Sequence, residues 1–496
     1  MDGIRDRLAR GAAWLIGARA LSNLAGFAGT LILARLLLPE DFGLVAIAVT
    51  VTTIVSAFTE LSVLAVLIHL RDVEEDHFHT AWTLSLIRGV VVAVLMGGMA
   101  WPLAAIYGDP RLIPIMLSLA GVAVCWSLYN PKMTRYTREL VFWQDALVGL
   151  SQKLATLVVS VAVAYAFRSY WAIVAGQAAA ALTMVVLGYV LMPFRPRLRL
   201  HDVRRMFSYS IWLSLGSLVS SLNARVDPLL IGYASGNTAL GHYTVGDNLA
   251  ALPTREVLSP LSSTLFPGFT KLADDPDGLR SAYLRAQGLL SVLAFPAGFG
   301  LALIAGPLVV VALGERWAPV APIIQLLAGV FALQTLSSAL GPLAMATGAT
   351  RALFNREVVI FALRMPLVVV GLALGGVMGA VVGRCVGLLI GTALGMTLAR
   401  RLTGVPLRTQ VLANWRTILA TAAMIAGVQG GLAVLGGPET SALATVVAIV
   451  LGGAAIYTAT LLVAWRAAGW PDGPERDFLE VAGRLVPGLS RLAERR

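Results

Sequence analysis

Long apolar stretches separated by short polar turns dominate the pattern along the whole chain. A helix that crosses a bilayer needs about 20 largely apolar residues, and the chain holds about fourteen such stretches. They cover residues 11–36, 42–68, 80–106, 112–130, 146–167, 170–192, 207–233, 241–266, 282–305, 319–346, 354–375, 377–399, 415–436 and 440–465. Turn signals such as Gly-Asp-Pro at 108–110 and Ala-Ser-Gly-Asn at 234–237 separate them. This pattern predicts an all-α polytopic membrane protein.

The composition agrees with a chain that lies almost entirely in lipid. Hydrophobic residues make up 57% of the 496 and charged residues 13%, whereas a soluble domain carries about 25% charged residues. The first apolar run is too long for a cleavable signal peptide and has no small-residue cleavage site after it, so we expect it to be kept as the first span. The chain is therefore predicted to have almost no soluble domain.

The placement of Lys and Arg predicts which connections face the cytoplasm, where these residues are enriched. Counting from the N-terminus, alternate connections hold most of the 38 Lys and Arg residues. The opposite connections hold Arg35, Arg111, Arg168 and Arg316. Both termini are therefore predicted to be cytoplasmic, and the net charge of +11 reflects topology rather than a nucleic-acid partner.

The most basic connection, 193–205, follows the sixth predicted span and divides the chain. We predict an N-lobe over 1–200 with spans 1–6, a C-lobe over 201–400 with spans 7–12, and spans 13 and 14 over 401–466. Gly43 and Gly241 occupy matching places after the first outer turn of each lobe, which suggests the internal repeat of alternating-access transporters. In the tail, 467–496, apolar residues recur at helical spacing from Phe478 to Leu492 with arginines between them, which predicts an amphipathic cytoplasmic helix.

Charged residues inside the predicted spans are the main functional signal. A charged side chain at a helix centre costs about 2.5–3.5 kcal/mol on the insertion scale, so it normally faces a partner or a hydrated cavity. The cations are Arg19, Arg88, Lys153, Arg225, Arg255, Arg364 and Arg384, and the acids are Glu60, Asp227, Asp247 and Glu256. Both predicted lobes contribute, and cations outnumber acids.

These residues predict a cationic, hydrated cavity with an anionic, large and partly polar ligand. The candidate substrate-binding residues are Arg19, Asn23, Arg88, Arg225, Arg255 and Arg364. A lipid diphosphate bearing sugars fits, because Arg can bind phosphate oxygens in bidentate fashion. Glu60, Asp227, Asp247 and Glu256 are candidates for ion coupling or charge pairing, and the sequence leaves open whether H⁺ or Na⁺ is coupled.

The motifs of common membrane enzymes are not found in the sequence. It contains no GxxxxGK[ST] phosphate loop and no HExxH pair. Cys125 and Cys385 lie in apolar runs far apart, so we expect neither a disulfide nor a metal site from them. We therefore expect no catalytic residue, no metal and no cofactor beyond a coupling ion.

Residues 34–43, with the sequence ARLLLPEDFG, resemble the start of polysaccharide-exporting flippases of the Wzx/WzxC kind. These belong to the multidrug/oligosaccharidyl-lipid/polysaccharide (MOP) exporter superfamily. The resemblance implies two bundles around a cationic cavity with alternating access to the two leaflets. It implies undecaprenyl-diphosphate-linked oligosaccharide repeats as substrates, for exopolysaccharide, capsule or O-antigen, and a place in the bacterial inner membrane. Arg19, Arg225 and Arg255 match the family's cavity residues by location, whereas the second span carries Glu60 and no interior cation.

Other functions stay open at this stage. Within transporters, the alternatives are a lipid II flippase and a drug antiporter, and the excess of cations disfavours the antiporter. A polysaccharide polymerase or ligase would need a large outer loop with charged pairs, which the sequence lacks. A non-transporting scaffold of a glycan assembly complex would leave the intramembrane charges without a role. We expect a monomer that contacts lipid-linked oligosaccharide and membrane lipid, with polysaccharide polymerase and export machinery as candidate partners.

Overall fold

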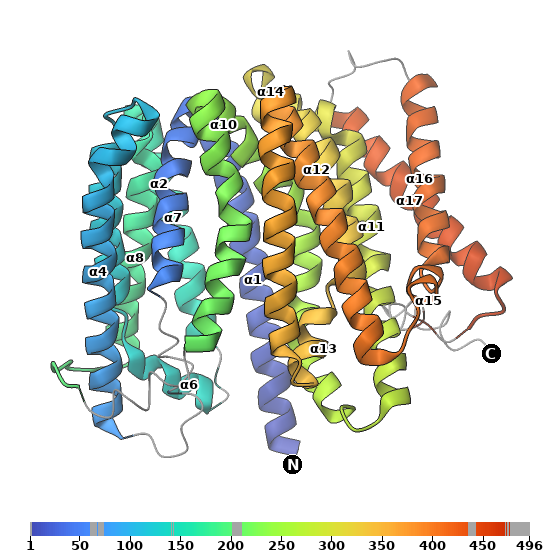
Figure 1. The fold of residues 1–496 in the computed structure, drawn as a ribbon, viewed down its shortest axis with the longest axis horizontal. Helices are drawn as coiled ribbons and strands as arrows, with labels where there is room; N and C mark the ends of the chain where they lie inside the picture. Colours follow the sequence, from blue (N-terminus) through green and yellow to red (C-terminus); the bar gives the residue numbers. More distant parts are fainter. Residues whose placement is uncertain are drawn as a thin grey trace. The chain divides into compact units, whose positions relative to one another are not determined.

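The computed structural model describes residues 2–59, 67, 74–139, 141, 143–200, 211–434, 443–471, 473 and 476, and within these it leaves out the side chains of 2–16, 20, 211–217, 256–264, 432–434 and 443–445. Over these residues, every regular element is a helix (Figure 1). The predicted all-α class is therefore confirmed. The predicted tail helix after residue 476 lies outside the described residues.

The chain forms two compact units, Met1–Thr244 and Val245–Arg496. The first unit contains α1 (Asp2–Leu36), α2 (Pro39–Phe58), α4 (Glu75–Tyr107), α5 (Leu112–Ser127), α6 (Thr134–Arg138), α7 (Trp143–Phe167), α8 (Trp171–Leu191) and the start of α10 (Ile211–Lys271). The second unit holds the rest of α10 and then α11 (Pro276–Leu313), α12 (Val320–Gln334), α13 (Leu340–Ala346), α14 (Thr350–Thr403), α15 (Leu407–Leu412), α16 (Trp415–Val434) and α17 (Leu443–Ala467). The predicted lobes divide at residue 200, and that assignment stays a prediction.

Many of these helices are suited to a membrane. Among the described residues, eight are long and apolar enough to cross it, or up to nine if the bent pair formed by α5 and the segment Pro131–Arg138 is one span. Many large apolar side chains on them are exposed, such as Val94, Val158 and Leu374, as expected where the surrounding solvent is lipid. The chain is a multi-pass membrane protein. The count of fourteen spans and the side of each terminus stay predictions.

Local chemistry sets several helix ends. Pro39 begins α2, and the Asp41 carboxylate accepts a hydrogen bond from the Leu38 backbone N–H at 3.0 Å, which satisfies a donor near the helix start. Gly108 ends α4 with φ 66°, a conformation that favours glycine. Of the span predicted over 42–68, α2 covers the part up to Phe58, and residues 60–66 and 68 lie outside the described residues.

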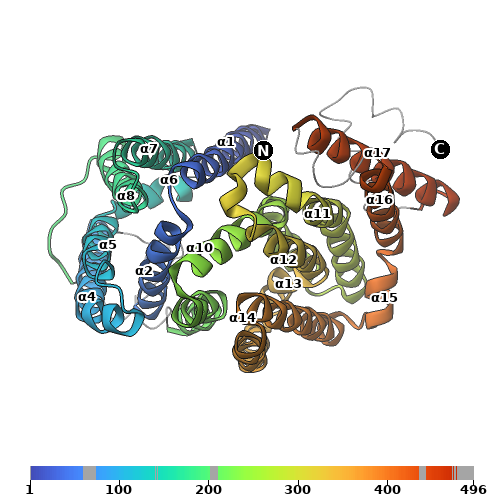
Figure 2. The same ribbon diagram turned by 90° about the horizontal axis from the view of Figure 1, so that it is seen from above.

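Glycines also break two long helical stretches where the sequence predicted turns. Gly236 interrupts α10 with φ 81° and ψ 175°, inside the predicted turn 234–237. Gly375 and Gly376 interrupt α14, between the spans predicted over 354–375 and 377–399. The two halves of α14 lie side by side (Figure 2).

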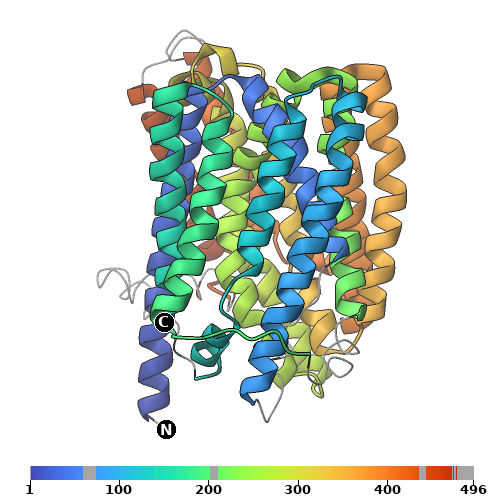
Figure 3. The same ribbon diagram turned by 90° about the vertical axis from the view of Figure 1, so that its left-hand side faces the viewer.

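In the first unit, neighbouring helices pack along their lengths. Figure 3 shows α4, α5, α7 and α8 as the blue to green helices running up and down this unit. The turn between α4 and α5 lies at one end of the unit, and the short α6 lies at the other (Figure 1). The two ends carry different polar clusters, which are described below.

Candidate functional site

The predicted substrate-binding arginines fall into two groups by exposure. Arg19 on α1 and Arg225 and Arg255 on α10 are exposed. Asn23 lies one turn after Arg19 on α1 and is half-buried. An exposed guanidinium on a membrane helix needs water or a polar ligand, because contact with lipid would be costly.

The second group of cations is enclosed by protein. Arg364 on α14 is 4% exposed, and its side chain lies directly against Gly387 of the same helical hairpin. Arg88 on α4 is half-buried and donates from Nη2 to the Ser56 carbonyl oxygen of α2 at 3.0 Å. These two arginines are therefore positioned by neighbouring helices.

Among the predicted acids, Asp247 has a defined partner in the second unit. Its Oδ1 lies 2.9 Å from Nη2 of Arg384 on α14. The Arg384 guanidinium carbon also lies 5.7 Å from the centre of the Phe331 ring on α12, within range of a cation–π contact. From the sequence, Arg384 is one of the charged residues inside the spans and has no assigned partner, and the structure pairs it with Asp247.

For the other three predicted acids, the structure shows less of their surroundings. Asp227 on α10 is buried in the first unit, as is Asn223 one turn earlier. Glu60 and the side chain of Glu256 lie outside the described residues. Among the described residues, no group of three or more His, Cys, Asp or Glu side chains could hold a metal ion.

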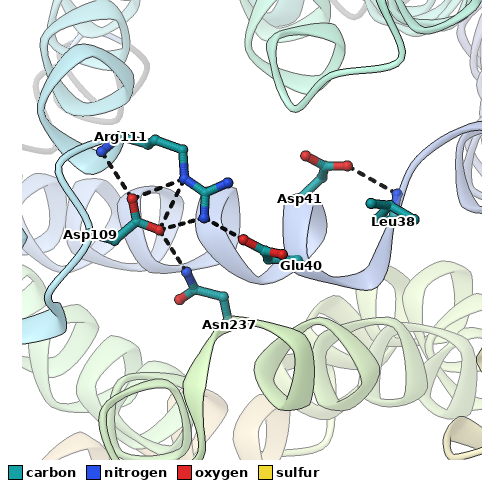
Figure 4. Close-up of polar contacts among 6 residues, drawn as sticks. All are labelled: Leu38, Glu40, Asp41, Asp109, Arg111 and Asn237. Carbon is teal, nitrogen blue, oxygen red and sulfur yellow. Dashed lines mark hydrogen bonds and ion pairs between the residues drawn. The ribbon is translucent and has the colours of Figure 1, made fainter.

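A polar cluster that the sequence did not predict joins three connections of the first unit (Figure 4). Arg111, after α4, donates from Nε to Asp109 Oδ1 at 3.0 Å and from Nη2 to Asp109 Oδ2 at 2.8 Å. The same guanidinium reaches Glu40 at the start of α2. Asn237, just after the break in α10, donates from Nδ2 to Asp109 Oδ2 at 2.9 Å. We call these four residues, Glu40, Asp109, Arg111 and Asn237, the outer cluster, because the sequence predicts all three connections to be outside.

Electrostatics hold the outer cluster together. Hydrogen bonds from the Arg111 guanidinium lower the pKa of the Asp109 carboxyl, and the Asn237 amide adds to that effect. Asp109 is 8% exposed, so its charge depends on these donors rather than on water. The sequence marked Asp109 only as part of a turn.

A second polar cluster lies at the other end of the first unit. Glu75, at the start of α4, is 2.9 Å from Lys132 Nζ and 2.8 Å from Arg135 Nη2. Arg199 Nη1 lies 2.6 Å from Asp76. These basic residues come from connections that the sequence places on one side of the membrane, and the structure brings them together at one end.

Backbones approach closely where α2 meets the second half of α10. A β-carbon on Gly43 would overlap the Asn237 carbonyl group, and one on Gly241 would overlap that of Pro39. Pro39 and Asn237 lie one helical turn before Gly43 and Gly241, respectively. The contact is therefore reciprocal, as an internal repeat related by a two-fold axis would make it.

A cavity of about 420 Å³ lies inside the first unit between α2, α4, α5 and α8. Its lining combines hydroxyl groups, the Arg88 guanidinium, the Gln177 carboxamide and aromatic rings. Sequence analysis placed Arg88 in a central cavity between the lobes, and that assignment stays a prediction; it did not single out Gln177. No sequence signal known to us would have placed Gln177 beside Arg88, since they lie on helices far apart in the chain.

The sequence of this chain is similar to those of proteins that take part in polysaccharide biosynthesis. The family model described as "Polysaccharide biosynthesis protein" matches residues 32–322. The lipopolysaccharide biosynthesis protein WzxC of Escherichia coli (strain K12) is 24% identical over 379 residues, covering 75% of this chain and 77% of that protein. The succinoglycan biosynthesis transport protein ExoT of Rhizobium meliloti (strain 1021) is 26% identical over 309 residues, covering 60% of each chain.

Solved structures share the fold at low sequence identity. The lipid II flippase MurJ, in an inward closed conformation, superimposes with a TM-score of 0.73 at 12% identity, covering 92% of this chain and 99% of that one. A multidrug resistance transporter of the MATE family and MOP superfamily, in an inward-facing conformation, gives a TM-score of 0.52 at 14% identity over 79% of this chain and 94% of that one. The fold is thus of the MOP type, and the family match over residues 32–322 shows that the chain belongs to the polysaccharide biosynthesis protein family.

Proposed function

We propose that this protein is a flippase that moves undecaprenyl-diphosphate-linked oligosaccharide repeat units across the bacterial inner membrane, without making or breaking covalent bonds. The observation that carries the proposal is the family match over residues 32–322, in a chain whose relatives include proteins named for lipopolysaccharide biosynthesis and succinoglycan transport. Exposed arginines on the helices supply the chemistry that such a substrate requires.

Exposed arginines at membrane depth support an anionic substrate. Arg19, Arg225 and Arg255 are exposed on helices of the two units. A diphosphate offers several oxygens, and each guanidinium can bind two of them at once. A substitution that removes one guanidinium should weaken binding of the diphosphate headgroup, because water replaces the lost contact, and it should leave the helices intact.

A charge pair in the second unit supports a role in neutralisation. Half-buried Asp247 offsets buried Arg384 at 2.9 Å, so the pair carries no net charge. Removing Asp247 would leave the Arg384 guanidinium buried without its counter-charge, which is unfavourable. We propose that this pair stabilises the packing of the second unit. If Asp247 couples transport to H⁺ or Na⁺, its carboxylate must separate from Arg384 during part of the transport cycle.

The outer cluster joins three connections at the predicted outer end of the first unit and so holds that end closed. Asn237 of α10 and Glu40 of α2 both reach the Asp109–Arg111 pair. These side chains tie the break in α10 to the first helices. We propose that these contacts separate when the substrate leaves on the outer side, which alternating access requires.

The test is translocation in proteoliposomes. Purified full-length protein is reconstituted with a fluorescent undecaprenyl-diphosphate oligosaccharide, and the fraction that reaches the outer leaflet is measured by a membrane-impermeant quencher. Wild type should increase the rate, and Arg19→Ala and Arg255→Ala should each lower it about tenfold, the effect of losing a charged hydrogen bond. Lys153→Ala, an exposed cation on α7, should leave the rate unchanged.

Two results would contradict the proposal. The first is a folded wild-type protein that moves none of several glycans, which favours the scaffold alternative. The second is an equal loss of transport in Lys153→Ala, which would show that any intramembrane cation is needed for folding or insertion rather than for substrate binding. Thermal melting of each variant in detergent separates these cases.

A further inference from the structure

The cavity inside the first unit has the size of a small-ligand site. Its volume is about 420 Å³, near the lower end of the range of about 300–1,000 Å³ typical of ligand pockets. All its walls, α2, α4, α5 and α8, belong to the first unit, so its shape is set by that unit alone.

Several hydroxyl groups of the lining can act only as acceptors toward a ligand. Thr52 donates its hydroxyl proton to the Ala48 carbonyl oxygen at 2.7 Å, and Thr53 donates to that of Val49 at 2.8 Å. Ser127 donates to the Val124 carbonyl oxygen at 2.6 Å. Each hydroxyl has one proton and two lone pairs. An occupant must therefore bring hydrogen-bond donors of its own.

Two planar polar groups supply donors to the same cavity. The Arg88 guanidinium is held in place by its hydrogen bond to the Ser56 carbonyl oxygen at 3.0 Å. The Gln177 carboxamide on α8 offers both a donor and an acceptor. No carboxylate is present among the lining residues of this cavity. An occupant therefore needs acceptors as well as donors, on a compact frame.

The rest of the wall is apolar or aromatic. Trp126 lies in the last turn of α5 and Tyr129 follows that helix, and Val92 and Leu119 complete that side. A sugar ring matches such a wall, because its rim carries hydroxyls that both donate and accept, and its C–H faces are apolar. Aromatic rings bury large apolar faces, and the polar atoms of Tyr and Trp can bond at the edge.

We propose that this cavity binds a single sugar ring of the substrate glycan. The acceptor hydroxyls of Thr52, Thr53 and Ser127, the planar groups of Arg88 and Gln177, and the ring of Trp126 together fit a polyhydroxylated ring. The volume accommodates one ring rather than a whole repeat unit.

The position of the cavity indicates when the ring binds. The lining residues of α2 belong to the half that ends at Phe58, and those of α4 run from its first half to its middle, at Val92. That end of the unit carries Glu75, Lys132 and Arg135 and is predicted to be cytoplasmic. The ring therefore binds on the loading side. This assignment of the occupant to the transported glycan rests on the proposed function.

A purely structural role for the polar lining gives different expectations. Ser56 lies in the last turn of α2, where carbonyl groups lack helical partners. Arg88 could act solely as a clamp on that turn. Substitution of Arg88 would then disturb folding, so the test uses Gln177 and Ala123, which line the cavity away from that hydrogen bond.

The experiment is saturation-transfer NMR on the full chain in nanodiscs of neutral lipid, with glucose, N-acetylglucosamine and glucuronate as separate probes. Transfer to ring protons of at least one sugar is expected for wild type. Gln177→Ala should weaken it about fivefold, as expected for one lost hydrogen bond, and Ala123→Leu should abolish it by filling the cavity. Gln152→Ala and Ala166→Leu on α7 are matched controls outside the cavity and should bind like wild type.

Each outcome is decisive when glycan translocation is measured on the same samples. Sugar transfer that is absent in folded wild type, or equal in wild type and Ala123→Leu, overturns the sugar site even if translocation occurs. Cavity-dependent transfer without translocation keeps the site and rejects the flippase. Transfer that depends on the cavity, with translocation slowed in Ala123→Leu and not in Ala166→Leu, supports both.

Discussion

Gly43 and Gly241 each face the backbone one helical turn before the other. A β-carbon at Gly43 would overlap the carbonyl group of Asn237, and one at Gly241 would overlap that of Pro39. Glycine is required at both positions because the two backbones pass too closely for any side chain, a feature common where helices pack in membranes.

Alanine at either position should therefore destabilise the first unit. We expect Gly43→Ala and Gly241→Ala each to lower the free energy of unfolding by about 1–3 kcal/mol, the usual effect of overpacking. Gly26→Ala on α1 is the control, since its β-carbon would meet nothing within 4 Å. Thermal melting in detergent measures the difference, and equal melting of all three variants would disprove the close contact.

The outer cluster should give the protein a defined acid sensitivity. Hydrogen bonds from Arg111 lower the pKa of Asp109 in the folded state. The resulting stabilisation is full above the unfolded pKa of about 3.9 and is lost as the pH falls through the lower folded value. Melting of wild type between pH 7 and pH 3 should fall more steeply than melting of Asp109→Asn.

The same variant tests the strength of the outer cluster at neutral pH. Asp109→Asn removes a carboxylate that accepts from Arg111 and Asn237, so we expect a loss of about 1–3 kcal/mol at pH 7. Glu139→Gln, which removes a carboxylate after α6 outside the outer cluster, is the control. Identical pH profiles for wild type and Asp109→Asn would show that Arg111 does not stabilise the carboxylate.

The Asp247–Arg384 pair should show strong coupling in a double-mutant cycle. Arg384→Gln leaves the half-buried Asp247 carboxylate without its guanidinium and should cost about 1.5–3 kcal/mol. The double variant Asp247→Asn/Arg384→Gln should recover part of this loss, with a coupling of at least about 1 kcal/mol. Glu75→Gln at the exposed end of α4 should cost less than about 1 kcal/mol. Additive effects at Asp247 and Arg384 would mean that the two side chains do not interact.

Glycines spaced by four or eight residues along α14 pack its two halves together. Gly371, Gly379 and Gly383 each face a backbone carbonyl of the opposite half, so an added β-carbon would overlap it. Gly379→Ala or Gly383→Ala should lower stability and the yield of folded protein, whereas Gly375→Ala should be tolerated, because nothing lies within 4 Å of its β-carbon. Equal yields for the three variants would argue against close packing of the hairpin.

Topology is open to a direct test with reporters. Both termini are predicted to be cytoplasmic, and the connection that contains Glu315 is predicted to be outside. Alkaline phosphatase fused after Glu315 should be active, and the same enzyme fused after Arg496 should be inactive. A green fluorescent protein at the C-terminus should be fluorescent. The opposite pattern would reverse the orientation while leaving the fold unchanged.

Part of the architecture follows from local sequence. Apolar runs long enough to span a bilayer predict helices wherever they occur, since the backbone must satisfy its hydrogen bonds internally in lipid. The predicted turn at 234–237 and the boundary near 376 are real breaks, because glycine adopts conformations that end a helix. The cations inside the spans can also be identified from the sequence, because each is a charged residue within an apolar run.

Partners across the chain could be decided only by tertiary structure. The sequence identified Asp247 as a charge-pairing candidate, but its partner, Arg384, lies on a helix far along the chain. The sequence indicates only that Asp109 lies in a turn, whereas the structure shows its carboxylate accepting hydrogen bonds from Asn237 and Arg111. Nothing in the sequence marks Gln177 as a site residue, whereas the structure places it in the lining of the same cavity as Arg88. The all-helical class could be predicted from local sequence, because it depends on hydrogen bonds and apolar surface within each segment. Which side chains meet depends on the register and rotation of helices packed against each other, and those are set by the whole bundle at once.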